Sequence, residues 1–211
     1  MKIVLRILLL AAIATLLYMC VQSIQSPIKF ERERKIREDA IVDRLIVIRN
    51  AQNGYRNMYG TYAGSFEDLQ NYLNNDSIPF IIKEGDLTDD QLKAGLTEKE
   101  AVKKGLIRRD TTWVLAKDTI LMRRGYDISK IGKVPGFEDH SFSLDTGTLR
   151  SPSGYVIPVF EAGVQYDVYL DGLERQLIIN LKDEKSKLKR FAGLRVGSVK
   201  DINNNAGNWE N

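Results

Sequence analysis

The hydrophobic positions of the chain begin with a continuous apolar run at the N-terminus. No charged residue lies between Ile7 and Val21. A bilayer core of about 30 Å requires about 20 residues of α-helix. Residues 3–22 meet this length if Arg6 reaches the interface along its aliphatic stem. Residues 1–27 are therefore predicted to be a transmembrane anchor.

A cleaved signal peptide also combines a basic start with a short apolar run. The end of this run, Tyr18-Met19-Cys20-Val21-Gln22, contains none of the small residues that a cleavage site requires. Met19 also differs from the small residue that precedes the cysteine of a lipoprotein signal. We therefore expect the anchor to be retained, with a mature chain that starts at or next to Met1 and has a mass near 24.0 kDa.

A helical spacing of hydrophobic positions follows the anchor. Residues 28–62 are predicted to form an amphipathic connecting helix, which Gly60 ends. Its stripe is aliphatic near the anchor and aromatic further along. The stripe is expected to pack on the protein's own sheet, with the tyrosine hydroxyls on polar partners. It is also the candidate interaction site. Its members alternate spacings of four and three residues: Ile41, Leu45, Ile48, Gln52, Tyr55, Tyr59 and Tyr62.

Short helices are predicted next, because three hydroxyl residues are each followed three positions later by an acid or amide that completes an N-cap. Two of the helices are expected to end at glycines, Gly95 and Gly105. The cap pairs are Ser65 with Asp68, Thr88 with Gln91, and Thr97 with Glu100.

Beyond Asp110 the pattern changes to short β-prone runs separated by turn residues, of which the last four are expected to form an antiparallel meander. The runs are Thr112–Met122, Ser141–Leu149, Tyr155–Phe160, Val164–Leu170 and Gln176–Leu181. The turn signals are Asp145-Thr146-Gly147, Ser153-Gly154 and Asp171-Gly172.

A lysine-rich helix at Lys182–Arg190 and an edge strand at Leu194–Val196 are expected to complete this part. Residues 63–202 thus form a predicted α+β domain outside the cytoplasm. Residues 203–211 form a polar C-terminal tail that is expected to be loose except for Trp209. The predicted fold class is α+β, with the connecting helix packed on a C-terminal antiparallel sheet and small helices between them.

Composition excludes several classes of function. Lys and Arg total 31 against 28 Asp and Glu, so no strong basic field indicates a nucleic-acid partner. One Cys and one His exclude a disulfide framework and a Cys/His zinc site within one chain. No cofactor or metal site is predicted.

The candidate catalytic motifs are weak. Asp145-Thr146-Gly147 resembles the active-site loop of retroviral-type aspartic proteases, but it also has the composition of a hairpin turn. His140 follows Asp139, but no serine or cysteine nucleophile lies in a recognisable elbow. The glycines lie singly, which indicates turns rather than a phosphate-binding loop. The sequence therefore predicts a non-enzyme.

Residues 40–70 resemble the helical spine of type IV pilins and pseudopilins. The resemblance lies in Ile48–Gln52 with Tyr55, in Tyr59-Gly60-Thr61-Tyr62, and in Ser65 to Leu69. It implies an envelope protein with an antiparallel sheet after the spine. The anchor lacks the small-residue/Phe cleavage site and the early glutamate of pilins, so the resemblance concerns the scaffold and not processing into a filament.

Anchor, stripe and resemblance together predict a structural or interaction subunit of a bacterial envelope assembly, with a protein partner or a second copy. The alternatives are an extracytoplasmic ligand-binding or sensory domain and, less favoured, an envelope enzyme. A plain count of Lys and Arg on the two sides of the anchor favours a cytoplasmic domain. Because long domains translocate largely regardless of charge, we expect an inner-membrane anchor with a periplasmic domain.

Overall fold

The computed structural model describes residues 2–88, 91, 93, 95, 97–121 and 127–210. The fold is α+β, as predicted from the sequence, and divides into two compact units. Unit 1 contains Met1–Arg49 and Lys130–Asn211, and unit 2 contains Asn50–Ser129.

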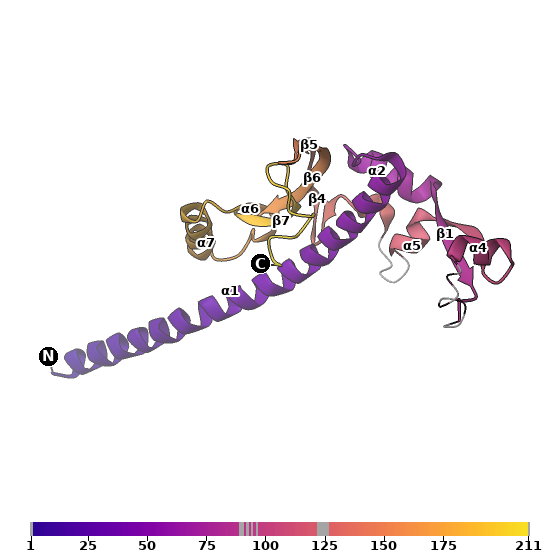
Figure 1. Ribbon diagram of the computed structural model, residues 1–211. Coiled ribbons are helices and arrows are strands. Elements are labelled where there is room, and N and C mark those ends of the chain that lie inside the picture. Colours follow the sequence, from indigo (N-terminus) through magenta and orange to yellow (C-terminus); the bar gives the residue numbers. More distant parts are fainter. Residues whose placement is uncertain are drawn as a thin grey trace. The chain divides into compact units, whose positions relative to one another are not determined.

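Helix α1 runs without a break from Lys2 to Tyr59 (Figure 1). It continues through Pro27, which cannot donate a backbone hydrogen bond. The helix ends where Gly60 adopts a φ of +78° and its N–H donates to the Arg56 carbonyl at 2.8 Å. A left-handed glycine is a common helix end, so the predicted stop at Gly60 is confirmed.

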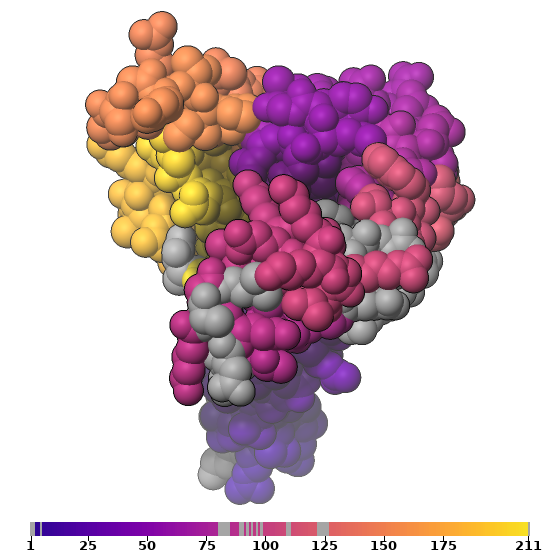
Figure 2. Space-filling view, turned by 45° about the vertical axis from the view of Figure 1, so that its right-hand side comes forward, coloured from indigo at the N-terminus to yellow at the C-terminus, as the bar shows by residue number. Residues whose placement is uncertain are grey.

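The N-terminal part of α1 is long and apolar enough to cross a membrane. Its most apolar stretch is not buried inside the protein. Figure 2 shows the indigo side chains of this segment uncovered at their N-terminal end. A helix whose apolar side chains find no protein partner requires another apolar environment.

The part of α1 that follows the apolar segment contributes to the core of unit 1. Phe30, Ile41, Leu45 and Ile48 are buried, at 0–4% exposure. Arg37 donates to two backbone carbonyls beyond β6, those of Tyr169 and Asp171, each at 2.9 Å.

The sheet of unit 1 has the order β5-β6-β7 and is antiparallel throughout. Central strand β6 contributes Val159, Phe160, Ala162 and Val164 to the core, and Glu161 is the one charged residue in its sequence. The other elements of unit 1, with their bounds, are β3 Lys133–Val134, β4 Phe137–Ser141, β5 Ser143–Arg150, β6 Val156–Gln165, α6 Tyr166–Tyr169, α7 Arg175–Lys187 and β7 Gly193–Gly197.

Unit 2 combines the end of α1 with a two-stranded antiparallel sheet and short helices. Its core contains Leu69, Tyr72 and Leu73 of α2, at 0–2% exposure, with Ile107 and Ala116. Its elements are α2 Phe66–Asn75, β1 Ser77–Glu84, α4 Glu98–Lys103, β2 Arg108–Leu115, α5 Ala116–Leu121 and the 3-10 turn η1 Ile128–Lys130 at its boundary.

The predicted helix caps at Ser65 and Thr97 are confirmed. Ser65 Oγ accepts from Asp68 N–H at 3.1 Å, and Thr97 forms a full capping box with Glu100. Thr88 N–H donates to the Gln91 side chain at 3.0 Å. Much of the helix predicted after Thr88 lies outside the described residues.

Three strand predictions require correction. The run Thr112–Met122 is a strand only to Leu115, after which α5 begins, and Met122 lies outside the described residues. The run Val164–Leu170 continues β6 to Gln165 and then forms α6. The run Gln176–Leu181 is the first half of helix α7. In each case a short apolar stretch fits either period, and packing selected the helix.

The strands that form the sheet of unit 1 also differ from the predicted strands. Tyr155–Phe160 and the start of the next predicted run form one strand, β6, and the third strand of the sheet is β7. Strand β1, Ser77–Glu84, has no counterpart among the predicted strands. The predicted edge strand at Leu194–Val196 is confirmed as β7.

Candidate functional site

The predicted stripe is mostly inside the protein. Ile41, Leu45 and Ile48 have 0% exposure in unit 1, and Gln52 (0%) and Tyr62 (6%) are buried in unit 2. Because the units divide the helix at Arg49, the stripe contributes to two cores. The aliphatic half packs in unit 1 beside the C-terminal sheet, whereas the aromatic half packs in unit 2.

The aromatic half forms a cluster of tyrosines. The rings of Tyr55 and Tyr59 lie 4.5 Å apart between centroids, and Tyr55 lies 5.5 Å from Tyr72. The Tyr59 hydroxyl donates to Asp76 at 2.5 Å, and this hydrogen bond raises the pKa of Tyr59 to about 12. Tyr59 is 51% exposed, so it is the stripe residue most accessible to a partner.

The motifs weighed for catalysis lie in strands. Asp145-Thr146-Gly147 is in the middle of β5, where its residues pair with Glu161, Phe160 and Val159 of β6, so its prediction as a turn was wrong. His140 is exposed in β4 rather than in a loop.

The turn predicted at Ser153-Gly154 is confirmed, with Gly154 N–H donating to the Ser151 carbonyl at 2.9 Å.

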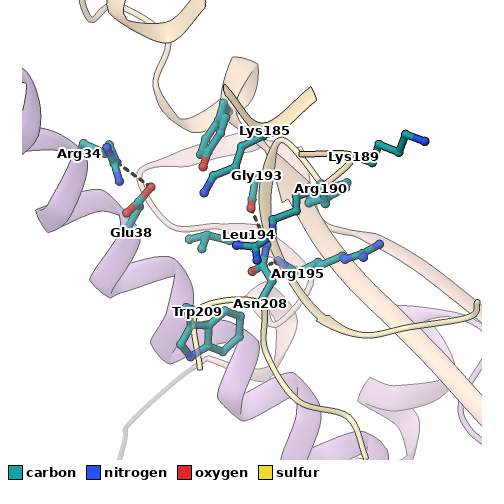
Figure 3. A pocket seen from close by; sticks show the side chains of 12 residues that line it. Arg34, Glu38, Lys185, Lys189, Arg190, Gly193, Leu194, Arg195, Asn208 and Trp209 are labelled. Atoms are coloured by element: carbon teal, nitrogen blue, oxygen red, sulfur yellow. Dashed lines mark hydrogen bonds and ion pairs between the residues drawn. The ribbon is translucent and has the colours of Figure 1, made fainter. Parts of the chain in front are cut away.

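A cleft of about 390 Å³ in unit 1 is lined mainly by charged and aromatic side chains (Figure 3). Three separate segments supply its cations, namely α1, the end of α7 with the following loop, and β7. Aromatic rings from α6, this loop and the C-terminal tail complete the wall. The charged residues of the lining are Arg34, Glu38, Lys185, Lys189, Arg190 and Arg195, and the aromatic ones are Tyr166, Phe191 and Trp209.

Two of these arginines are held in place by carboxylates. Arg34 contacts Glu38 at 3.1 Å, and Arg195 contacts Glu161 at 3.2 Å. The Arg195 guanidinium also lies over the Phe191 ring, 5.3 Å from its centroid. An arginine has five N–H donors, so each retains donors that these contacts do not use.

Glu38 is the only carboxylate in the lining, and its side chain is held by two donors. It accepts from Arg34 and from the Tyr169 hydroxyl, the latter at 3.0 Å. Burial and then the charge of Glu38 raise the pKa values of Tyr166 and Tyr169. Both phenols therefore remain protonated at neutral pH, and the Tyr166 hydroxyl is a potential donor at the cleft.

The cations at the end of α7, unlike Arg34 and Arg195, have no carboxylate partner among the described residues. Within the described part of the chain, no carboxylate pairs with the side chains of Lys185, Lys189 or Arg190. Cations at a helix C-terminus complement its dipole, which equals only about half a charge. This interaction cannot offset three positive charges. Figure 3 shows Lys185 pointing toward Glu38 and Lys189 pointing away from α1.

The C-terminal tail is ordered, contrary to the prediction that it is loose. The Asn208 side chain accepts from Arg195 N–H at 3.1 Å and donates to the Gly193 carbonyl at 2.9 Å. Arg49 contacts Glu210 at 2.7 Å, and this bond is the main cause that lowers the pKa of Glu210. The tail thus runs along β7 and places Trp209 in the cleft wall.

Unit 2 presents a different kind of surface, a mainly apolar pocket of about 340 Å³. Trp113 of β2, Met58 of α1 and Pro79 of β1 contribute to its lining. Trp113 is 64% exposed and Met58 45% exposed. Exposed tryptophan beside a mainly apolar pocket is typical of protein contact surfaces.

Neither surface has metal-site chemistry. Among the described residues no group of three or more His, Cys, Asp or Glu side chains could hold a metal ion. Comparisons with protein-family models, with curated proteins and with solved structures find no match to this chain.

Sequence reasoning did not find the cleft. The lysine-rich segment Lys182–Arg190 is the one local signal of it, and by itself this segment predicts only a helix. Arg34 and Arg195 lie more than a hundred residues apart in the chain, so no local pattern connects them. The order of the tail was also missed, although its asparagines favour the left-handed backbone seen at Asn204 and Asn205.

Proposed function

We propose that the chain is a single-pass, membrane-anchored and non-catalytic interaction subunit of a bacterial cell-envelope assembly, similar in plan to subunits of pili or secretion systems. Its partner is another envelope protein or a second copy. The observation that carries the proposal is the continuity of α1. An exposed apolar segment passes directly into a helix that is buried in unit 1, so the folded part is attached to the membrane without a flexible linker.

The proposed location is the inner membrane, with the folded units in the periplasm. Cysteine labelling tests this, because Cys20 is the one cysteine of the chain. In a Cys20→Ser background, Ser153→Cys introduces a thiol at an exposed turn. We expect a membrane-impermeant maleimide to label this thiol in intact spheroplasts as fully as in lysed ones. Labelling only after lysis would place the units in the cytoplasm and overturn the orientation.

The proposed contact surface is the mainly apolar pocket of unit 2. A photo-crosslinking amino acid placed at Trp113 is expected to give light-dependent adducts of defined mass in living cells. The matched control is the same amino acid at Glu67, an exposed position on α2 in the same unit. Adducts of equal yield at both positions, or none at Trp113, would contradict a specific partner at this pocket.

The basic cleft favours a second function, an extracytoplasmic ligand-binding domain. Its volume lies within the range of about 300–1,000 Å³ that small-molecule sites occupy. Cationic groups line it from α1 and from the end of α7 with the following loop. Subunit and ligand-binding roles are compatible, because the cleft is in unit 1 and the apolar pocket in unit 2.

A further inference from the structure

We propose that the basic cleft of unit 1 binds a phosphate-bearing anion. Arg34, Lys185 and Arg190 line it from α1 and from the end of α7 with the following loop, whereas Figure 3 shows the Arg195 side chain extending away from Arg34. Arginine forks and lysine ammonium groups are the usual ligands of phosphate oxygens. The inference needs no protein partner, so it holds or fails independently of the assembly role.

Two arginine side chains of the cleft are held in place by other residues, as in a preformed binding site and unlike in a chance group of surface charges. Arg34 is held by carboxylates on its own helix, and its side chain is only 24% exposed. Arg195 is held by Glu161 and lies over Phe191, with 29% of its side chain exposed. The Arg34 guanidinium is therefore positioned before a ligand arrives, which lowers the entropic cost of binding, and Arg195 fixes the strand that forms the opposite wall.

Lys185 and Arg190 supply the uncompensated charge. A phosphate monoester carries between one and two negative charges near neutral pH. Binding in the cleft would place these charges beside cations that have no carboxylate partner in the described structure, in a concave site where screening is weaker than on an open surface. Asn208 and the protonated Tyr166 add neutral groups to the same wall.

Two sources of such a phosphate are compatible with the position of the cleft. Arg34 lies twelve residues beyond residue 22, where the apolar segment ends, which is about 18 Å along a helix. A phosphate on an extended lipid head group could reach this height above the membrane, and so could a soluble phosphate compound. The experiment below separates the two.

Tryptophan fluorescence gives a direct probe, because the chain has two tryptophans and Trp209 lines the cleft. In a Trp113→Phe background only Trp209 reports. The full chain in neutral detergent is titrated with sodium pyrophosphate at 150 mM salt. We expect a saturable change in Trp209 emission, and a heat of binding by calorimetry that gives the same Kd.

Charge-neutralising variants decide whether the cleft is responsible. Lys185→Gln and Arg190→Gln are each expected to weaken binding by about tenfold or more, because each removes a charge-assisted contact. Lys187→Gln is the matched control, since it removes the same charge from the same helix outside the cleft lining. Circular dichroism verifies that each variant is folded.

Nanodiscs distinguish the sources of the phosphate. If a head group is the ligand, phosphatidylinositol 4-phosphate, whose head group carries a phosphate monoester, will shift Trp209 emission and compete with pyrophosphate when it is added to neutral nanodiscs. If the ligand is soluble, only pyrophosphate will produce the shift. The proposal is overturned if folded protein shows no saturable response to either probe. It is also overturned if Lys187→Gln weakens binding as much as Lys185→Gln does.

Discussion

Replacing Gln52 by leucine is expected to destabilise unit 2 by about 3 kcal/mol, because two buried backbone groups would lose their partners. The Gln52 amide accepts from Ala63 N–H at 2.9 Å and donates to the Ala63 carbonyl at 3.0 Å. Gln52 is 0% and Ala63 is 1% exposed, so water cannot replace these bonds. Leucine has a similar volume and leaves both Ala63 groups unpaired.

The same bonds explain why a polar residue stands in an otherwise apolar stripe. The chain reverses after Gly60, and the segment that follows α1 has no strand or helix of its own to satisfy its backbone. Gln52 supplies a donor and an acceptor to this segment from the helix. The side chain thus fixes the path of the chain from α1 toward α2.

Urea unfolding of the full chain in detergent measures the effect, with Trp113 as the only tryptophan in a Trp209→Phe background. Gln70→Leu is the control, because the Gln70 amide makes one bond to the Ser129 carbonyl, at 3.2 Å, in a more exposed position. We expect it to cost less than about 1 kcal/mol. Equal losses for the two variants would show that Gln52 does not have this role.

Gly197→Ala is expected to have a comparable or larger effect on unit 1, of about 3 kcal/mol or more. Gly197 ends β7 with a φ of +73°, and a Cβ there would lie 2.2 Å from the Phe160 carbonyl oxygen. The left-handed conformation costs a residue with a side chain about 1–2 kcal/mol. The contact with β6 adds about 1–3 kcal/mol, because the backbone oxygen cannot rotate away.

Gly154→Ala separates these two causes. Gly154 has a φ of +86° and open space around its Cβ position, so this substitution tests conformational strain alone. We expect a loss of about 1–2 kcal/mol for Gly154→Ala and a clearly larger loss for Gly197→Ala. Trp209 fluorescence in a Trp113→Phe background reports the unfolding of unit 1. Equal losses would mean that the β6 contact is not close in solution.

Features that depend on neighbouring residues were predictable from the sequence. The apolar run, the helix stop at Gly60 and the caps at Ser65 and Thr97 each involve groups within a few positions of one another. Their energetics are nearly independent of the rest of the protein. The edge strand β7 was visible for the same reason, since glycines bracket its β-prone residues.

Features that depend on packing were decided by the tertiary structure. The segment Gln176–Leu181 has an apolar pattern that fits a strand or a helix, and its burial at Ile178 within α7 selected the helix. The tail, polar in composition, is held by hydrogen bonds to β7 and by an ion pair to α1, neither of which a local pattern contains. Contacts between distant segments also set whether the stripe is exposed.

The cleft is a feature that depends entirely on tertiary packing. The sequence determined that most of its lining residues are charged or aromatic. Helix α1 fixed the spacing of Arg34 and Glu38 by a local rule, because they lie one helical turn apart. Bringing Arg34 to Lys185, Arg195 and Trp209 required the chain to close loops of more than a hundred residues. Such closure is stabilised by the burial of the whole core of unit 1. Only the tertiary structure therefore decided that this protein has a basic cleft.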